Sequence, residues 1–295
     1  MTTNLGEVQN NGFEISLNSL NIQRPNFEWR TTLNFSFNNN KIKHLYYEYE
    51  DVTDEQGNVI GQKEQDDTSN GWFIGHSIGE IWNYKVTGIW QKNEAAEAAK
   101  YGQRPGDPKV ENSYTADDKV NADGTRTPVY NDKDKQFLGK TAASVRWSLR
   151  NDFVIFKNFD FSFSMYSLMG HKSLETYYLN NDNGGNMVTY TFNTFAKDYW
   201  TIDNPTNDYA RLDAQGPTGA MSAGRLHNRT FIRLDNISLG YTFPKKWISK
   251  LSLSNLKLFA TVRNVAVWAP DWEYADPETG GLATRTFTFG LNLTL

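Results

Sequence analysis

The chain of 295 residues contains no cysteine, which excludes disulfide frameworks and thiolate metal sites. Its four histidines, His44, His76, His171 and His227, form no HExxH motif and no pair at positions i and i+4. Each is therefore predicted to be a loop residue rather than a metal ligand. GxSxG, P-loop and GxGxxG motifs are also missing. Acidic pairs in loops leave a glycosidase site open, but no feature singles out one pair. We predict no catalytic residue and expect that the chain is not an enzyme.

Long apolar segments are missing as well. No stretch approaches the roughly 20 apolar residues of a membrane-spanning helix, and the mean hydropathy is -0.64. A helical membrane protein is thereby excluded, whereas a membrane β-barrel is not, because its strands alternate and its loops are polar. The net charge of -4 comes with no basic stripe, so no nucleic acid is expected as a partner. The opening "MTTNLGEVQNNG" lacks the basic and apolar regions of a signal peptide.

What the chain does have is a repeated alternation of apolar and polar side chains with a period of two. This pattern is typical of strands with one apolar and one polar face. A strand of eleven residues, tilted near 45°, spans roughly 25 Å, the height of the apolar band of an outer-membrane barrel. Soluble strands usually have about five or six residues. The seven alternating segments are 13–19, 27–38, 144–156, 159–167, 231–243, 256–265 and 284–295, with Phe259 as an apolar residue on the polar side of its segment.

The connections between these segments alternate between short and long. Short links cover 22–26 and 157–158, with a moderate one at 244–255, and the long polar segments are 39–140, 170–228 and 269–283. This predicts an all-β, antiparallel transmembrane β-barrel with short periplasmic turns and long extracellular loops. Residues 39–140 are then a long extracellular insertion and 170–228 an extracellular loop. Inside the insertion, "IGEIWNYKVTGIW" predicts a strand or hairpin, and "NEAAEAAKYG" predicts a short helix that Gly102 ends.

The alternation assigns side chains to the two faces of the predicted barrel wall. The apolar set should face lipid and the polar set the lumen. The lipid-facing residues are Phe287, Phe289, Leu291, Leu293, Leu239 and Tyr241; the lumen-facing residues are Asn236, Ser238, Thr288 and Asn292.

Two further features point weakly to ligands. The segment "DDKVNADGT" partly matches a calcium loop, with Asn121 and Asp123 as candidate ligands, although Lys119 occupies the place of the first carboxylate. We therefore expect no cofactor, with a structural calcium ion as the open alternative. Aromatic side chains in the long segments could stack on sugars, but packing of the loops is favoured. They are Trp72, Trp82, Tyr177, Tyr178, Trp200 and Trp272.

Five sequence blocks, in order along the chain, carry a resemblance to a known family. They are "GEVQNNGFEISLNSLNIQRPNFEWRTTLNFSFNNNKI", "GEIWNYKVTGIWQ" with "EAAKYGQRPGDPKV", "NPTNDYARL", "FIRLDNISLGYTFPKKW" and "LKLFATVRNVAVW". From residue 6 to its end the chain resembles the C-terminal barrel portion of SusC/RagA-like TonB-dependent transporters of Bacteroidetes outer membranes.

The resemblance implies import of large nutrients, such as oligosaccharides or peptides, across the outer membrane of a Gram-negative bacterium. It also implies a SusD-like surface lipoprotein as partner, energy supplied through TonB, and a plugged barrel of about 22 strands. Residues 1–295 would then be the C-terminal portion of the barrel, with signal peptide, TonB box and plug domain missing. The final Leu295 departs from the aromatic residue on which such barrels usually end. The alternatives are a small self-contained porin and a soluble carbohydrate-binding β-sandwich.

A barrel cut to these strands would have two unpaired edges, and each unsatisfied backbone group in lipid costs several kcal/mol. We predict that the 295-residue chain, produced alone, aggregates or closes in a non-native way. Refolding in detergent, followed by electrophoresis with and without heating, checks this. A cooperative, heat-modifiable monomer would contradict the prediction.

Overall fold

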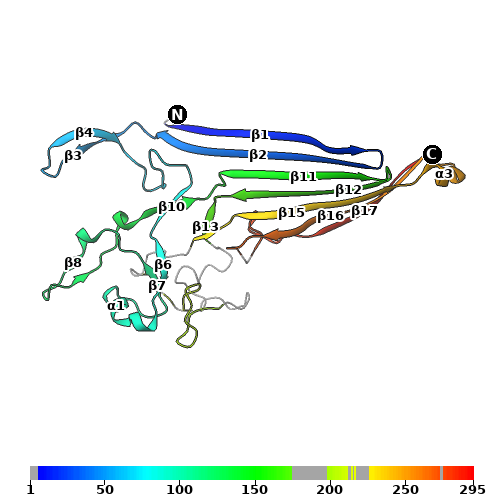
Figure 1. The fold of residues 1–295 in the computed structure, drawn as a ribbon. Coiled ribbons are helices and arrows are strands. Elements are labelled where there is room, and N and C mark those ends of the chain that lie inside the picture. Colours follow the sequence, from blue (N-terminus) through cyan, green and yellow to red (C-terminus); the bar gives the residue numbers. More distant parts are fainter. Residues whose placement is uncertain (1–5, 175–197, 212–213, 215, 217–225, 273–274) are drawn as a thin grey trace.

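The computed structural model describes residues 6–174, 198–211, 214, 216, 226–272 and 275–295. Its main feature is one antiparallel sheet in which seven strands pair in chain order (Figure 1). Each of the seven alternating segments forms one of these strands, so the prediction of an antiparallel β-sheet is confirmed. The strands are β1 (Glu7–Arg24), β2 (Phe27–His44), β11 (Val145–Ile155), β12 (Phe159–Met169), β15 (Phe231–Thr242), β16 (Asn255–Trp268) and β17 (Thr286–Thr294).

The two ends of this sheet differ as the connection lengths predict. At one end, which we call the turn end, tight turns join β1 to β2 and β11 to β12, and a short helical segment joins β15 to β16 (Figure 1). Phe156 and Lys157 adopt φ angles of 51° and 65° to make the second turn. The helical segment consists of α3 (Lys245–Ile248) and the 3₁₀ helix Ser249–Leu251. The long connections all leave from the opposite end, the loop end, and the C-terminus lies at the turn end.

The loop end is built from small hairpins rather than from irregular chain. The strand pairs are β3 (Tyr49–Thr53) with β4 (Val59–Glu64), β5 (Glu80–Asn83) with β10 (Gln136–Lys140), β6 (Val86–Ile89) with β7 (Pro108–Val110), β8 (Lys119–Val120) with β9 (Arg126–Thr127), and β13 (Lys172–Leu174) with β14 (Leu226–Asn228). Three 3₁₀ helices accompany them: Lys92–Glu94, Thr115–Asp117 and Asp132–Asp134.

Two local predictions for the loop end have different outcomes. The helix predicted from "NEAAEAAKYG" is present as α1 (Ala95–Lys100), and Gly102 follows it with a φ of 67°. The segment "IGEIWNYKVTGIW" does form strands, β5 and β6, but they pair with β10 and β7. The hairpin alternative was therefore wrong, because partners more than 20 residues away take the edges that a hairpin would have used. Within the described residues, no helix is long and apolar enough to cross a membrane.

The apolar face of the sheet has no cover among the described residues. Along β1 and β17 the side chains of Ile15, Leu17, Phe287 and Phe289 are 54% to 79% exposed. The buried apolar side chains lie elsewhere: Ile89, Trp200, Ala210 and Ala214 form one small core at the loop end, and Val110 with neighbouring tyrosines forms another. A soluble sheet would bury its apolar face against a second layer. This sheet stands as a single layer with hydrophobic residues on its outside.

One polar side chain interrupts the apolar face and is satisfied there. Asn151 of β11 is only 5% exposed. Its Oδ1 accepts hydrogen bonds from Trp29 Nε1 at 2.8 Å and from the Thr31 hydroxyl at 2.7 Å, both on the adjacent strand β2. An unpaired acceptor at this place in lipid would cost several kcal/mol. The two donors on β2 thus make Asn151 acceptable on an apolar surface.

Phe259, the apolar residue on the polar side of its strand, has a structural reason. It lies directly opposite Gly290 of β17 in the register. A Cβ atom built on Gly290 would approach Phe259 Cζ to 2.3 Å, so the ring occupies the space that a side chain would fill. A glycine leaves the backbone of a strand uncovered, because it has no side chain. An aromatic ring on the neighbouring strand can cover this backbone and so stabilise the pairing. Phe259 and Gly290 thus occupy two neighbouring positions of the polar face with a single aromatic ring.

We predict that Gly290→Val destabilises the sheet, in the full-length protein, by about 1 to 3 kcal/mol, because the added atoms overpack against Phe259. The measurement is the midpoint of heat modifiability in detergent. Gly61→Val is the matched control, since a Cβ on Gly61 would meet nothing within 4 Å. The double variant Gly290→Val with Phe259→Ala should regain most of the loss, and a Gly290→Val midpoint equal to wild type would refute the packing argument.

Candidate functional site

The polar face of the sheet is the surface on which hydrophilic side chains gather, and we use the name for this surface throughout. Across β1, β2 and β11 the side chains form hydrogen-bonded rows. Ser16 donates to Asn34 at 2.7 Å, and the Asn34 amide donates to Ser148 at 3.2 Å. On the same face, between β15 and β16, the Ser238 and Thr261 hydroxyls lie 3.0 Å apart. Such rows follow from the register, which places residues of the same parity side by side.

Ion pairs occupy the half of the polar face near the turn end. Arg30 pairs with Glu28 at 2.6 Å, and Arg150 pairs with Asp152 at 2.6 Å, in each case two residues apart on one strand. Lys257 reaches across β15 to Asp160. Gly240 lies under this last pair, and a Cβ there would come within 2.8 Å of Lys257 Cε. These pairs are partly exposed, and each contributes little to stability, but together they give this half of the face alternating charge.

The register sorts the predicted face residues into two groups. Thr288 lies opposite Thr261, which in turn lies opposite Ser238, and Asn292 lies opposite Lys257. Asn236 follows the same parity and faces Arg263. The predicted apolar set lies on the other face, where Phe289 and Leu239 both neighbour Ala260. Leu291 and Tyr241 both neighbour Leu258, Phe287 lies opposite Val262, and Leu293 lies opposite Leu256. The grouping into two faces is established; the assignment of the faces to lipid and lumen stays a prediction.

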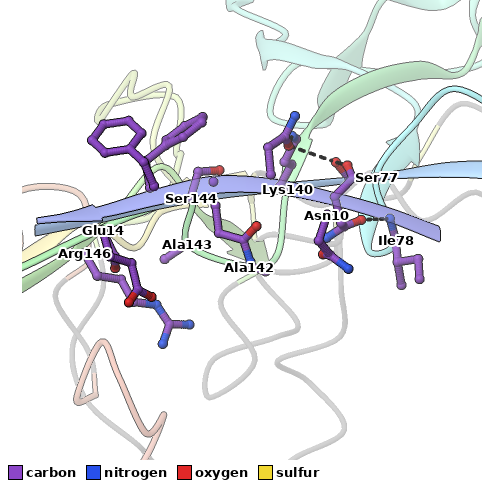
Figure 2. A pocket seen from close by; sticks show the side chains of 16 residues that line it. Asn10, Glu14, Ser77, Ile78, Lys140, Ala142, Ala143, Ser144 and Arg146 are labelled. Atoms are coloured by element: carbon purple, nitrogen blue, oxygen red, sulfur yellow. Dashed lines mark hydrogen bonds between the residues drawn. The ribbon is translucent and has the colours of Figure 1, made fainter.

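A groove of about 590 Å³ opens on the polar face at the loop end (Figure 2). Its walls come from β1, β2, the start of β11 and the segment after β4. Ser77 donates to the backbone oxygen of Asn40 at 2.7 Å, and the Asn40 side chain accepts from the backbone N–H of Ile78 at 2.7 Å. Lys140 donates to Asn39. These bonds hold the loop against the end of β2 and leave a cavity lined mainly by amides and hydroxyls.

The charged residues of the groove are Glu14, Lys140 and Arg146. Glu14 and Arg146 lie on either side of Ser36 in neighbouring strands. Neither has an ion-pair partner among the described residues, in contrast to the paired charges near the turn end. A surface that offers one acid, two cations and several amides can bind a polar, extended ligand through many weak contacts.

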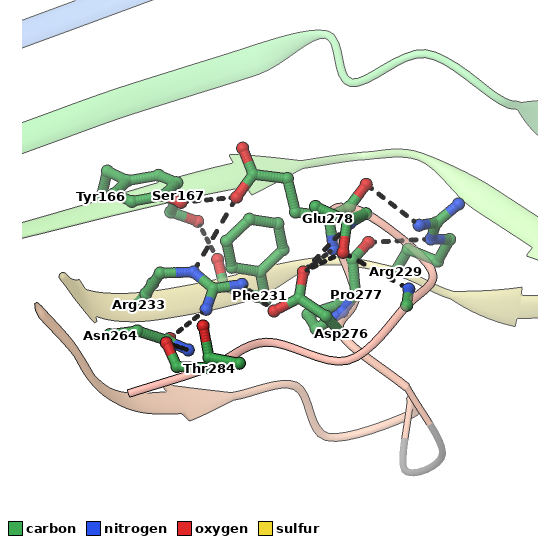
Figure 3. A network of polar contacts seen from close by, with 12 residues as sticks. Tyr166, Ser167, Arg229, Phe231, Arg233, Asn264, Asp276, Pro277, Glu278 and Thr284 are labelled. Carbon is green, nitrogen blue, oxygen red and sulfur yellow. Dashed lines mark hydrogen bonds and ion pairs between the residues drawn. The ribbon is translucent and has the colours of Figure 1, made fainter. Parts of the chain in front are cut away.

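A second polar network fastens the loop between β16 and β17 onto the polar face (Figure 3). Arg233 of β15 forms a buried ion pair with Asp276 of the loop, with side-chain exposures of 5% and 2%. Arg229 donates through Nε to the backbone oxygen of Pro277 at 2.9 Å. The Tyr166 hydroxyl donates to Glu278. Tyr166 of β12, Arg233 of β15 and Arg229 from the link before β15 thus hold the turn at residues 276–281, and we call these contacts the loop fastening.

Asp276 serves both the turn and the ion pair. Its Oδ1 accepts from the backbone N–H groups of Glu278 and Thr279, each at 3.0 Å, while Oδ2 accepts from Arg233. Burial raises the pKa of Asp276, but the hydrogen bonds from Arg233 and from the backbone outweigh burial and lower the pKa below its ordinary value. The carboxylate is therefore held in its charged form.

Two blocks that carry the family resemblance meet at the loop end. Asn207 of "NPTNDYARL" accepts from the backbone N–H of Ile89 at 3.0 Å. Arg211 pairs with Asp107 of "GQRPGDP" at 2.7 Å, both almost fully buried. Gly106, with a φ of 92°, permits the contact, since a Cβ there would approach a Trp200 ring carbon to 2.5 Å. Sequence separation of about 100 residues hid this docking from pattern analysis.

The calcium-like segment forms the β8–β9 hairpin. Asp123 accepts from the backbone N–H of Thr125 at 3.0 Å and from its hydroxyl at 2.6 Å. Asn121 donates to the Thr125 and Thr127 hydroxyls at 3.0 Å. Within the described part of the chain, no group of three or more histidine or acidic side chains is arranged to hold a metal ion. The two candidate ligands act in turn hydrogen bonds, and calcium binding stays a prediction.

Of the six aromatic residues singled out in the sequence, three are packed. Trp200 and Trp272 are 8% and 7% exposed, which confirms packing for both. Trp82 lies against Phe73 with ring centres 4.7 Å apart, whereas Trp72 is 38% exposed. Tyr177 and Tyr178 lie outside the described residues.

The four histidines all lie at the loop end. His44 is the last residue of β2 and contacts Glu64 at 2.8 Å, and His76 stacks on Phe137 at 3.7 Å. His171 and His227 are buried. Burial lowers the pKa of His171, and the nearby Arg229 and Arg146 lower it further. His44 lies in β2 and His227 in the short strand β14, so for these two residues the predicted loop was wrong.

Sequence analysis missed the loop fastening because Arg233 and Asp276 are 43 residues apart. One signal was present. The apolar residues Ile232 and Leu234 are out of phase with Ile237 and Leu239, and the structure has a register shift between Leu234 and Asn236 at this point. Phase slips of this kind indicate a β-bulge, and bulges often re-aim a side chain.

Comparisons with known proteins bear on what this surface belongs to. No protein-family model matches the chain. The chain is 27% identical to TonB-dependent receptor P26 of Formosa agariphila over 99% of its length, and 27% identical to TonB-dependent receptor SusC of Bacteroides thetaiotaomicron over 100%. It covers 29% and 27% of those two proteins.

Solved structures share the fold. The RagAB peptide transporter matches 98% of the chain with a TM-score of 0.68 at 18% identity, and the chain covers 30% of that protein. The same importer in its closed-closed state matches with a TM-score of 0.65. The chain therefore spans less than a third of the length of the proteins it matches. In sequence the chain is thus similar to TonB-dependent receptors, SusC among them, and in fold it is similar to the RagAB peptide transporter.

Proposed function

We propose that the chain forms seven membrane-spanning strands of an outer-membrane transporter that imports large nutrients such as oligosaccharides or peptides. The apolar face meets lipid, the polar face lines the lumen, the turn end is periplasmic and the loop end is extracellular. The rest of the transporter, which makes up more than two thirds of the relatives' length, supplies the coupling to TonB. A SusD-like surface lipoprotein is the proposed partner at the loop end, in a Gram-negative outer membrane.

The observation that carries this proposal is the single-layer sheet with one exposed apolar face and one hydrogen-bonded polar face. In lipid every backbone group needs a partner within the protein, and a sheet of strands paired edge to edge meets this need. The strands of nine to 18 residues are long enough to cross the apolar band when tilted. The alternation of tight turns with long connections fits the two sides of an outer membrane.

The competing functions fit less well. A soluble carbohydrate-binding β-sandwich would need a second sheet over the apolar face, and the other sheets of the described chain have only two strands each, located at the loop end. A self-contained porin would need β1 and β17 to pair, and these are the two outer strands of the sheet. For an enzyme, the described part of the polar face offers paired charges and amides, and its one hydroxyl named next to a carboxylate, Tyr166 beside Glu278, serves to hold a loop. Transport is therefore proposed rather than catalysis.

The first test is uptake by cells that carry the full-length transporter and its lipoprotein. A fluorescent oligosaccharide mixture and a fluorescent peptide mixture serve as probes. Import should require the transporter gene and should stop when an uncoupler abolishes the proton gradient that TonB uses. Uptake that survives the uncoupler would favour a passive porin and reject the proposal.

In the same assay we predict that Arg146→Gln raises the KM for the imported probe about threefold to tenfold with little change in maximal rate. Arg146 offers charge-assisted hydrogen bonds worth about 1.5 to 3 kcal/mol when fully made, and its exposure reduces the effect. Lys157→Gln is the control, because Lys157 is an exposed cation at the turn end. Equal KM values for both variants would exclude the groove as a substrate contact.

The loop fastening should give a pH-dependent order to the extracellular loop. Because the pKa of Asp276 is lowered in the folded protein, its stabilisation is fully present above the unfolded value of about 3.9 and is lost as the pH falls below that value through the folded pKa. Asp276→Asn leaves the buried Arg233 with the more distant Glu278, at 3.8 Å, as its carboxylate partner and should cost about 3 kcal/mol locally. We predict amide exchange about a hundredfold faster at residues 278–281, measured by hydrogen exchange on the full transporter.

Below pH 4 the wild-type loop should lose its protection, whereas the Asp276→Asn loop should show no further loss. Glu278→Gln is the matched control, since the Glu278 side chain is 37% exposed and the amide oxygen of glutamine can still accept from Tyr166, so exchange should change little. Unchanged exchange in Asp276→Asn at neutral pH would show that the ion pair does not hold the loop.

A further inference from the structure

The β3–β4 hairpin and its flanks, residues 46–67, stand apart from the rest of the loop end (Figure 1). β3 and β4 pair only with each other. We call this segment the acidic arm, because it contains eight acidic residues and one lysine, whereas the whole chain has a net charge of only -4. The acidic residues are Glu48, Glu50, Asp51, Asp54, Glu55, Glu64, Asp66 and Asp67.

The arm also exposes apolar and aromatic side chains. Val59 and Ile60 of β4 are 59% and 65% exposed, and Tyr47 and Tyr49 are 51% and 53% exposed. A two-stranded hairpin on its own is marginally stable in water. The apolar side chains of this hairpin are in addition left in contact with water. Both features would be relieved by a partner that covers the arm.

The base of the arm is firmly anchored, which means that it is presented in a fixed direction. Glu64 Oε1 accepts from the backbone N–H groups of Leu45 and Tyr47 at 2.7 and 2.9 Å, and its other oxygen contacts His44 at the end of β2. The Tyr46 hydroxyl donates to Asp67 at 2.7 Å. A preorganised element loses less entropy when it binds.

We propose that the acidic arm is a docking element for a second protein that presents a basic surface around an apolar centre. The extracellular position of the arm rests on the proposed function. Opposite charge around a small apolar contact is the usual composition of a protein interface rim and core. Val59, Ile60 and Tyr49 would supply the apolar contact, and Glu48, Asp51 and Glu55 the surrounding charge.

Other occupants fit the arm less well. No group of three or more acidic or histidine side chains in the described residues is arranged for a metal ion, so a bound cation does not account for the acidic charge. An anionic membrane surface would repel the arm. A symmetric contact between two copies would set one group of eight carboxylates against the other.

The test places a photoreactive amino acid at Ile60 of the full-length transporter in native outer membranes. We expect one protein adduct whose yield falls at least fivefold between 0.05 M and 1 M salt, because exposed charges are screened. The triple variant Glu48→Gln, Asp51→Asn and Glu55→Gln should lower the yield at low salt by a similar factor. It leaves Asp54, Glu64 and Asp67, which fold the arm, unchanged.

Two controls make the result specific. Lys63→Gln removes the single cation of the arm and should raise the yield. A photoreactive residue at Leu282, 90% exposed in the β16–β17 loop, should give no adduct with this salt dependence. The purified adduct partner must then bind the purified transporter with an affinity that the triple variant weakens.

The inference is overturned by adducts to a second transporter copy or to lipid alone, by no protein adduct, or by a yield that neither salt nor the triple variant changes. The uptake assay is run on the same strains. Uptake without a salt-dependent adduct rejects the arm and keeps the proposed function. A salt-dependent adduct on a transporter that imports nothing leaves the docking role standing and rejects import.

Discussion

The hydrogen-bonded register between neighbouring strands is the constraint on which the rest of the structure depends. Leu149 lies opposite Leu33 on one side and Met165 on the other, and the same alignment runs across the sheet. Because side chains alternate with a period of two, a slip of one residue in any pair would move a whole strand's apolar set to the polar face. In lipid such a slip would expose hydroxyls and carboxylates to hydrocarbon. The register therefore fixes both surfaces at once, the apolar one and the polar one.

Departures from the alternation are each compensated by a neighbour in the same register. Asn151 on the apolar face is met by two donors of β2, and Gly290 is covered by the ring of Phe259. The irregularity between Leu234 and Asn236 lies next to Arg233, which stays in the ladder opposite Val267 and binds Asp276 with its side chain. The first two exceptions preserve the wall. The third turns a wall residue into an anchor for a loop.

The sequence alone predicted the wall well, because each strand carries its own signal. All seven strands, the difference between the two ends and the helix α1 followed from periodicity, connection length and a terminating glycine. The partners of β5 and β6 did not follow, since short strands of four residues carry no information about which distant edge they meet. The loop fastening and the Arg211–Asp107 pair could not be predicted either, because the sequence does not show which distant residues meet in the fold. Buried ion pairs depend on a geometry that only the folded chain supplies.

The two parts of the molecule are stabilised by different physics, and this divides their roles. The seven-stranded sheet, which we call the wall, needs paired backbone groups and an apolar face. Many sequences can meet these two requirements. The loop end holds its shape through specific contacts: small aromatic cores, Gly106 where no side chain fits, and carboxylates that each bind a defined partner. Specific contacts of this kind can differ between relatives that share the wall. Differences in ligands and partners between such proteins should therefore depend on the loop end and on its border with the polar face. The groove, the fastened loop and the acidic arm all lie there.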